Sequence, residues 1–410
     1  MPARIRTSRP DHRDRAGTAA WTAAWTAPPQ RPSSSFQTNW SEEGFHDHTL
    51  RQVVRVTAPG DELRIRLSNR YGTSPLQLTG ATVGLAADRG AGQVPGSTRE
   101  LTFAGKESAV VPVGGRLASD PAGLRTDRLR RLTVTLYLRE RTGAATFHDQ
   151  AYATSYRARG DRRANDDGTP FTETTESLYY LTDVEVRGNE AGRRLGGRAD
   201  GVVAFGDSLT DGFGSTTDAD RRWPDALADR LAAQGTPRPV LNSGIGGNLL
   251  LHDSSWFGDS AWSRFERDVL DKPGVGTVVL LEGLNDIGFS ESDLTTYKPN
   301  PAVSVAELIA AQRALIRQAH RRCVEVVGAT LLPMKGAEYY NATSAAKIRE
   351  LNHWIRTSGA FDAVVDLNRA LAAPDDPERL NPAYDSGDHK HPNDAGYEVV
   401  AEEVAKALKK

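Results

Sequence analysis

Four short segments in the second half of this 410-residue chain hold the residue types that nucleophilic acyl transfer requires. A serine hydroxyl becomes a strong nucleophile when an imidazole takes its proton and a carboxylate holds that imidazole in the right tautomer. Asp388 and His391 are three residues apart, so on a tight turn Asp388 can bind Nδ1 of His391 and leave Nε2 facing Ser208. The segments are Gly206-Asp207-Ser208-Leu209, residues 242–248, Gly283-Leu284-Asn285-Asp286 and residues 388–393.

The same segments offer hydrogen-bond donors for the oxyanion of a tetrahedral intermediate. Such an intermediate needs preorganised donors close to its negative oxygen. The backbone N–H of Ser208, the side-chain amide of Asn285 and a backbone N–H in the second segment would supply three. Gly244, Gly246 and Gly247 compete for that third place, and the spacing of the residues does not choose among them.

The elements that must position these residues alternate between apolar strands and amphipathic helices. We predict strands at residues 201–205, 240–241, 277–281, 324–332 and 363–367, and helices at 224–234, 303–321, 346–356 and 395–409. Continuous apolar strands separated by helices indicate a parallel sheet covered on both faces. Active sites in such sheets lie outside the carboxyl ends of the strands. Each segment follows a predicted strand, so all four should meet at one edge of the sheet.

The first half of the chain follows a different period. Apolar residues alternate with polar ones between about residues 50 and 186, as in Leu63-Arg64-Ile65-Arg66-Leu67, and turn signals separate the runs. This alternation predicts half-buried strands of an antiparallel β-sandwich. We therefore expect an N-terminal extension (1–35), a β-sandwich domain (36–188), a glycine-rich linker (189–200) and an α/β domain (201–410). We also expect the sandwich to pack beside the catalytic edge; the alternative is an appendage packed elsewhere.

Composition limits the classes of partner. Lys and Arg number 51 against 53 Asp and Glu, for a net charge of −2, which argues against a tail-driven nucleic-acid binder. No apolar run approaches the length of a membrane span, and the single cysteine, Cys323, rules out an intrachain disulfide. The arginine-rich residues 1–15 lack the apolar stretch of an export signal. From the sequence as written we expect a cytoplasmic protein. We expect a secreted protein if this N-terminus is a trimmed or wrongly assigned start.

The four segments, in order and at their spacing, resemble the four conserved blocks of the GDSL/SGNH hydrolase superfamily. The resemblance covers residues 201–410 and implies a flavodoxin-like α/β/α three-layer sandwich with a five-stranded parallel sheet, and a serine esterase or lipase that needs no metal or cofactor. By position it makes Ser208 the nucleophile, His391 the base and Asp388 its partner, with Ser208, Gly247 and Asn285 as the oxyanion hole. The first half matches none of these blocks and resembles the β-sandwich domains that precede the catalytic domain in some secreted bacterial esterases.

Several alternatives remain open at this stage. Asp388, His389 and His391 have side chains that can bind a metal ion. Trp256 and Phe257 either form a substrate-binding wall or anchor a long loop. The same site would also serve an acyltransferase, or a carbohydrate O-deacetylase whose β-sandwich binds carbohydrate. A dinucleotide-binding enzyme is disfavoured, because the turn after the first strand lacks Gly-x-Gly-x-x-Gly. We expect a small-molecule or polymeric ester as substrate and no nucleic acid.

Overall fold

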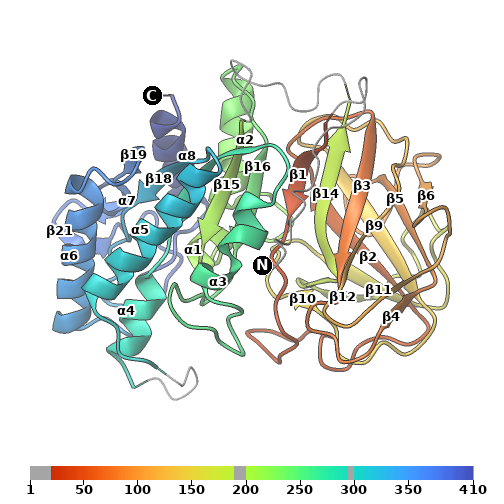
Figure 1. Cartoon of the computed structure of the whole chain (residues 1–410), viewed down its shortest axis with the longest axis horizontal. Helices are drawn as coiled ribbons and strands as arrows, with labels where there is room; N and C mark the ends of the chain where they lie inside the picture. Colours follow the sequence, from red (N-terminus) through yellow and green to blue (C-terminus); the bar gives the residue numbers. More distant parts are fainter. Residues whose placement is uncertain (1–19, 189–199, 294–299, 410) are drawn as a thin grey trace, which may run out of the picture.

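The computed structural model describes residues 20–188, 200–293 and 300–409. It contains two groups of sheets, which we name the N-terminal β region (residues 20–188) and the C-terminal α/β region (residues 200–409) (Figure 1). Of the predicted linker, only Asp200 lies within the described residues; residues 189–199 lie outside them, as do residues 1–19 of the predicted extension.

Two antiparallel sheets form most of the N-terminal β region. The first has the order β1 (Thr22–Thr26), β14 (Leu181–Arg187), β3 (Glu62–Ser68), β8 (Arg116–Ala118). The second has the order β12 (Glu173–Thr175), β11 (Ser155–Arg159), β2 (His48–Arg55), β9 (Arg131–Leu138), β5 (Gly80–Leu85), β6 (Arg99–Leu101). Two small sheets pair β10 (Phe147–His148) with β13 (Leu178–Tyr179), and β4 (Leu76–Leu78) with β7 (Ala109–Val111).

The two large sheets share one apolar core, as the alternating pattern predicts. Successive side chains of a strand point to opposite faces, so alternate residues meet between the sheets. Members of this core, all fully buried, are Leu63, Ile65, Leu67, Leu132, Val134 and Leu136. The predicted antiparallel β-sandwich is confirmed.

The first described strand, β1, belongs to both regions. It pairs with β14, and Figure 1 shows it between β14 and β16 (Val240–Gly244) of the α/β region. Ala23 packs into the core of the α/β region, whereas the next residue, Ala24, packs into the core of the β region. This strand falls within residues 1–35, which the sequence analysis assigned to an extension. We therefore propose that the β-sandwich domain begins before residue 36 and includes β1.

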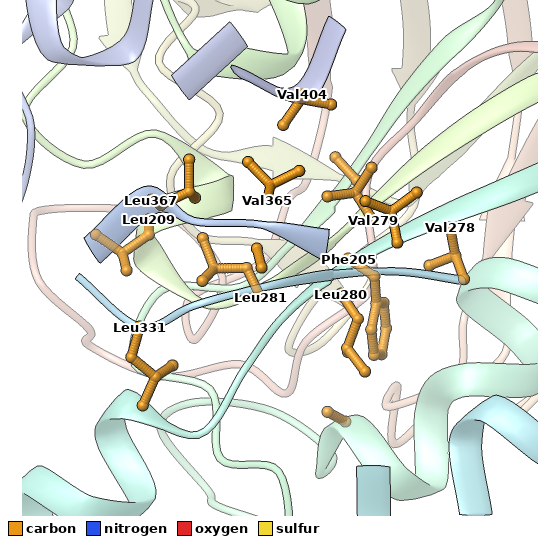
Figure 2. Packing of buried hydrophobic residues seen from close by; sticks show 14 of the residues in the cluster. Phe205, Leu209, Val278, Val279, Leu280, Leu281, Leu331, Val365, Leu367 and Val404 are labelled. Carbon is orange, nitrogen blue, oxygen red and sulfur yellow. The ribbon is translucent and has the colours of Figure 1, made fainter. Parts of the chain in front are cut away.

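The C-terminal α/β region is built on five parallel strands. Their order is β16, β15 (Gly201–Gly206), β17 (Val275–Leu281), β18 (Glu325–Ala329), β19 (Ala363–Val365). Figure 2 shows Phe205, Val279, Leu281 and Val365 of these strands within one apolar cluster. The expected five-stranded parallel sheet is confirmed.

Helices cover both faces of this sheet. The longer ones are α2 (Trp223–Ala233), α5 (Val305–Arg321), α6 (Ala342–Thr357) and α8 (Asp394–Ala407). The chain runs from β15 to β16 in one direction and then crosses to β17, β18 and β19 in the other. Because such crossovers are right-handed, the pair α2 and α8 lies on one face and the pair α5 and α6 on the other. This change of direction opens a crevice at the carboxyl ends of the central strands.

The sequence analysis did not predict the short elements. These are α1 (Ser208–Asp211), α3 (Ala261–Phe265), the π-helix η2 (Glu266–Leu270), α4 (Leu284–Ser290), α7 (Leu367–Leu371) and a hairpin of β20 (Ala372–Ala373) and β21 (Asp376–Leu380). Helices of one or two turns are not stable alone, so tertiary contacts rather than local patterns determine them. None of the helices among the described residues has the length and apolar character needed to cross a membrane.

Polar contacts join the two regions along the length of the α/β sheet. The backbone N–H of Ala23 donates to the carbonyl oxygen of Pro273 at 2.9 Å, and that of Val240 donates to Oγ1 of Thr57 at 3.0 Å. Side-chain pairs across the interface include Arg31–Asp259, Tyr71–Asp259, Arg55–Asp229, Arg131–Asp220, Thr154–Asp218 and Lys272–Asp183. The β region is therefore docked against the α/β region.

Candidate active site

Ser208, His391 and Asp388 form one hydrogen-bonded chain, although the serine and the histidine are 183 positions apart. Oγ of Ser208 is 2.7 Å from Nε2 of His391, and Nδ1 of His391 is 2.5 Å from Oδ2 of Asp388. An ionised carboxylate only accepts hydrogen bonds, so Nδ1 carries the proton and Nε2 accepts from the serine hydroxyl. In this arrangement the imidazole can take a proton from the serine.

The environment of this chain favours the protonation states that a general base requires. Burial lowers the pKa of His391, and the nearby carboxylate of Asp388 does not fully offset this effect. Burial raises the pKa of Asp388, but hydrogen bonds from the ring and the backbone N–H of His391 outweigh burial and hold it below its ordinary value. At neutral pH the imidazole is therefore neutral and the carboxylate ionised.

Ser208 lies at a sharp turn from strand to helix. The strand β15 is buried along its whole length and ends at Gly206, where an added Cβ would lie 2.2 Å from Oγ1 of Thr210. The next residue, Asp207, caps α1 by accepting the backbone N–H of Leu209 on Oδ1 at 3.0 Å. Ser208 is thus the first residue of α1, at the carboxyl edge of the sheet.

The segment at the end of β16, which we name the glycine loop (residues 244–248), borders the pocket that contains Ser208. Gly247 has φ of +72°, and a Cβ there would lie 2.4 Å from the ring of Phe257, so this position excludes side chains. Gly247 lines the pocket around Ser208. The N–H groups of Gly244 and Gly246 donate to Oδ1 of Asn242 at 2.9 Å and Oδ2 of Asp211 at 3.0 Å. These contacts favour Gly247 among the three candidate glycines.

A single buried guanidinium anchors the glycine loop to the sheet. Arg264, which is fully buried, donates to Oδ1 of Asn248 at 2.9 Å and to the carbonyl oxygens of Ser243 at 2.8 Å and Gly206 at 2.9 Å. The planar guanidinium presents several donors in a fixed geometry. The ends of β15 and β16 are thereby tied to the loop that follows β16.

Asn285 is held beside the same site by three hydrogen bonds. Its amide nitrogen donates to Oδ2 of Asp207 at 3.2 Å and to the carbonyl oxygen of Asn248 at 3.1 Å, and the hydroxyl of Tyr339 donates to its Oδ1 at 3.3 Å. The side chain is buried, and it lines the pocket together with Ser208 and Gly247. To stabilise an oxyanion, the amide would have to share one of its two hydrogens with the substrate.

Three buried carboxyls lie beneath the site. Burial, with a further contribution from Asp286, raises the pKa of Asp207 to about 7, and burial raises the pKa of Asp286 to about 6. Burial and the charge of Asp207 raise the pKa of Glu282 well above its ordinary value. Asp286 accepts the backbone N–H groups of Leu250 and Leu251 at 2.7 and 3.1 Å, so it holds the chain that follows the glycine loop.

Side chains from both regions line the pocket, which has a volume of about 290 Å³. The α/β region contributes ten lining residues, which are Ser208, Phe213, Gly247, Asn285, Phe289, Glu338, Tyr339, Asp388, Lys390 and His391. The N-terminal β region contributes Phe36 and Gln150. Phe36 stacks on Phe257 with ring centroids 5.6 Å apart, and Gln150 is buried with an Oε1 that has no hydrogen-bond partner.

The predicted substrate-binding pair lies outside this pocket. Phe257 is buried behind the glycine loop and contacts Phe36 and Phe289, and neither it nor Trp256 lines the pocket. Phe257 therefore fits the alternative reading, in which these aromatics anchor a long loop. The wall it supports is made by Phe36 and Phe289.

The two histidines of the alternative metal site have different surroundings. The ring of His389 binds Asp385 at 2.8 Å and is largely exposed, whereas the ring of His391 points to Asp388 and Ser208. The two imidazoles therefore have separate carboxylate partners. In residues 20–188, 200–293 and 300–409, no three His, Cys, Asp or Glu side chains are grouped so that they could hold a metal ion.

Seven residues that line the pocket were not predicted from the sequence: Phe36, Gln150, Phe213, Phe289, Glu338, Tyr339 and Lys390. Phe213 lies five residues after Ser208, and its ring is 4.3 Å from that of His391, so its nearness to the motif was a usable signal. Phe289 follows Asn285 by four residues, one helical turn, which was also a usable signal. Phe36 and Gln150 carry no local signal, because only the docking of the two regions brings them to the site.

Comparison with protein families gives one match, to the GDSL-like lipase/acylhydrolase family over residues 204–399. The search of curated proteins found no match.

Among solved structures, the chain is similar to a lipolytic protein of the G-D-S-L family from Desulfitobacterium hafniense DCB-2, at 23% identity over 51% of this chain and 99% of that one, with a TM-score of 0.38. It is similar to an acylhydrolase from Bacteroides fragilis at 22% identity, over 51% and 86% of the two chains and with a TM-score of 0.39. An acetylxylan esterase from Geobacillus stearothermophilus is 21% identical over 52% and 96%, with a TM-score of 0.39. All three similarities cover about half of this chain.

Proposed function

Residues 204–399 belong to the GDSL-like lipase/acylhydrolase family, which makes the chain an enzyme acting on esters, and from this premise we propose that it is a serine-dependent carboxylic ester hydrolase with Ser208 as nucleophile. His391 is the general base and Asp388 orients it. Ser208, Gly247 and Asn285 donate to the oxyanion. Residues 201–410 form the hydrolase domain, and the described residues 20–188 form a second domain.

The reaction runs through an acyl-enzyme. Nε2 of His391 takes the proton of Ser208 as Oγ attacks the ester carbonyl, and the resulting oxyanion is stabilised by the three donors. The tetrahedral intermediate collapses, and His391 gives its proton to the departing alcohol. A water molecule then attacks the acylated serine, with His391 again as base, and releases the acid. The ionised Asp388 stabilises the imidazolium that forms in each half of the reaction.

One observation carries this proposal: the continuous chain of hydrogen bonds from Ser208 Oγ through His391 to Asp388, with distances of 2.7 and 2.5 Å. A serine used only as a helix cap would not need a buried imidazole aligned on its hydroxyl. In α1, moreover, the cap is Asp207, which leaves the hydroxyl of Ser208 to His391.

We also propose that the N-terminal β region forms part of the substrate-binding pocket. Phe36 and Gln150 place the N-terminal β region in the wall of the pocket that holds Ser208. The side-chain amide of Gln150 can hydrogen-bond to a polar group of a substrate held in this pocket. The β region therefore contributes to substrate binding and does not act only as a spacer.

Ser208→Ala tests the proposal directly. Without the nucleophile, hydrolysis of a small soluble ester should fall by about 10³-fold or more, while the melting temperature stays close to that of the wild type. Ser215→Ala is a matched control, because its hydroxyl donates to the carbonyl oxygen of Gly212, three residues earlier, and not to His391. Ordinary turnover by folded Ser208→Ala enzyme would refute the proposed nucleophile.

A further inference from the structure

A histidine of the N-terminal β region reaches into the α/β region beside the glycine loop. The imidazole of His148, in β10, has Nδ1 3.1 Å from the carbonyl oxygen of Pro28 and Nε2 3.1 Å from Oδ1 of Asp211. The side chains of His148 and Asp211 are only 5% and 2% exposed. This buried pair therefore lies at the interface of the two regions.

The hydrogen-bond partners determine where the protons lie. A carbonyl oxygen only accepts, so Nδ1 of His148 carries a proton. Oδ2 of Asp211 accepts the backbone N–H of Gly246 at 3.0 Å, and a carboxylate can accept hydrogen bonds on both of its oxygens. A second proton must then lie on Nε2, between the ring and Oδ1. His148 is thus held as an imidazolium; burial lowers its pKa, but Asp211 outweighs burial and raises the pKa above the ordinary value.

Asp211 connects this histidine to two parts of the candidate site. It is the last residue of α1, three positions after Ser208, and its other oxygen holds the N–H of Gly246. Gly246 immediately precedes Gly247, whose left-handed conformation turns the loop toward the pocket. One carboxylate thus joins the helix of the nucleophile to the loop of the oxyanion donor, and His148 fixes that carboxylate from the other side.

We infer that His148 is a positioning residue: through Asp211 it holds the glycine loop in register with Ser208, so the N-terminal β region helps to set the rate of the chemical step. This inference rests on the proposed function. His148 itself does not line the pocket, so it acts through Asp211 and the backbone of Gly246. Its loss should affect kcat more than KM, because the oxyanion forms only in the transition state.

Other titratable groups face the pair. The carboxyl of Asp149, which accepts a hydrogen bond from Ser35, has its pKa raised by burial to about 6 and faces His148. Arg222, Tyr152 and Tyr397 interact electrostatically with Asp211. The side chain of Arg222 binds Asp225 at 2.7 Å, and burial raises the pKa of each of the two tyrosines well above its ordinary value. Among these groups, His148 is the one that forms a hydrogen bond to Asp211 across the interface, through the proton on its Nε2.

The test compares His148→Gln with the wild type on a small soluble ester. Glutamine is neutral and cannot bind both Pro28 and Asp211, so kcat should fall by about tenfold while KM changes by less than about twofold; a 1 Å misplacement can cost 10²-fold. In the wild type, kcat should decrease at alkaline pH, because the imidazolium of His148 then loses its proton. The variant should lack this alkaline limb.

A control separates positioning from the stability of the interface. Asp229→Asn weakens Arg55–Asp229, another ion pair between the two regions, and should leave kcat and its pH profile unchanged. Folded His148→Gln enzyme with wild-type kcat and alkaline limb would overturn the inference. If Ser208→Ala kept activity, the proposed function would fail instead, which is a distinguishable result.

A second measurement needs no substitution. In the wild-type protein, the ring of one histidine should titrate above 6.5, the ordinary histidine pKa, in ¹⁵N-detected spectra. The backbone amide signals of Gly246 and Gly247 should shift over the same pH range. Amide signals that do not respond to that titration would overturn the inference even if His148→Gln failed to fold.

Discussion

The two regions of this molecule contribute to the site in different ways. Every group that we assign to bond making or breaking comes from the C-terminal α/β region: Ser208, Gly247 and Asn285 follow strands of its sheet closely, and Asp388 and His391 lie on the loop before α8. The N-terminal β region contributes the wall residues Phe36 and Gln150 and the ion pair of His148 with Asp211. The reacting groups thus lie in one region, and some of the residues that surround them come from the other region across the interface.

This difference explains why one contribution follows from local sequence and the other does not. A nucleophile at a strand end is placed by its own backbone turn, so neighbouring residues predict it. His148 and Gln150 are two residues apart in one segment, yet the first points to Asp211 and the second lines the pocket. Their roles depend on how two separately folded sheets dock, which no short motif encodes.

Asn285→Ala gives the largest effect expected after loss of the nucleophile. Removing one oxyanion donor should lower kcat by about 10²- to 10³-fold with a much smaller change in KM. Steady-state kinetics on a small ester measure the split. Asn368→Ala provides a control, since its side-chain oxygen accepts a hydrogen bond from Arg356 and it does not line the pocket around Ser208. A rise in KM alone would assign Asn285 to ground-state binding.

Gln150→Leu tests the contribution of the β region to binding. Loss of one hydrogen bond is worth about 1–1.5 kcal/mol, so kcat/KM should fall about fivefold to tenfold for esters whose alcohol part carries hydroxyl groups. A simple alkyl ester should be little affected. Gln77→Leu makes the same change at an exposed position of β4 and should alter neither rate. Equal rates for wild type and Gln150→Leu on every ester would remove the β region from the binding site.

Chelation is expected to have no effect on the rate. The proposed reaction uses only Ser208, His391, Asp388 and backbone or amide donors, and His389 is bound to Asp385. Activity should be unchanged after dialysis against EDTA. A loss that zinc or calcium restores would revive the metal site considered for Asp388, His389 and His391.

Much of the C-terminal fold and its candidate site followed from the sequence, because fully apolar strands mark their own ends. The strand at residues 201–205 and the helix at 224–234 lie within about one residue of β15 and α2. The helix α4 was not expected, although it carries Asn285, because seven residues cannot form a stable helix alone. The place of β1 was missed for a similar reason: its pairing with β14 spans about 160 residues and leaves no local pattern.

The most direct test of the proposed site is the structure of the enzyme after reaction with a p-nitrophenyl phosphonate that carries a hydroxylated alcohol group as a second ester. Oγ of Ser208 displaces p-nitrophenolate from phosphorus, and the alcohol group stays in the adduct. We predict phosphorus bonded to Oγ of Ser208, one phosphonyl oxygen within hydrogen-bond distance of the N–H of Gly247 and the amide of Asn285, and the alcohol group against Phe36 and Gln150. Labelling of another residue, or an adduct whose alcohol group points away from the N-terminal β region, would contradict the shared site.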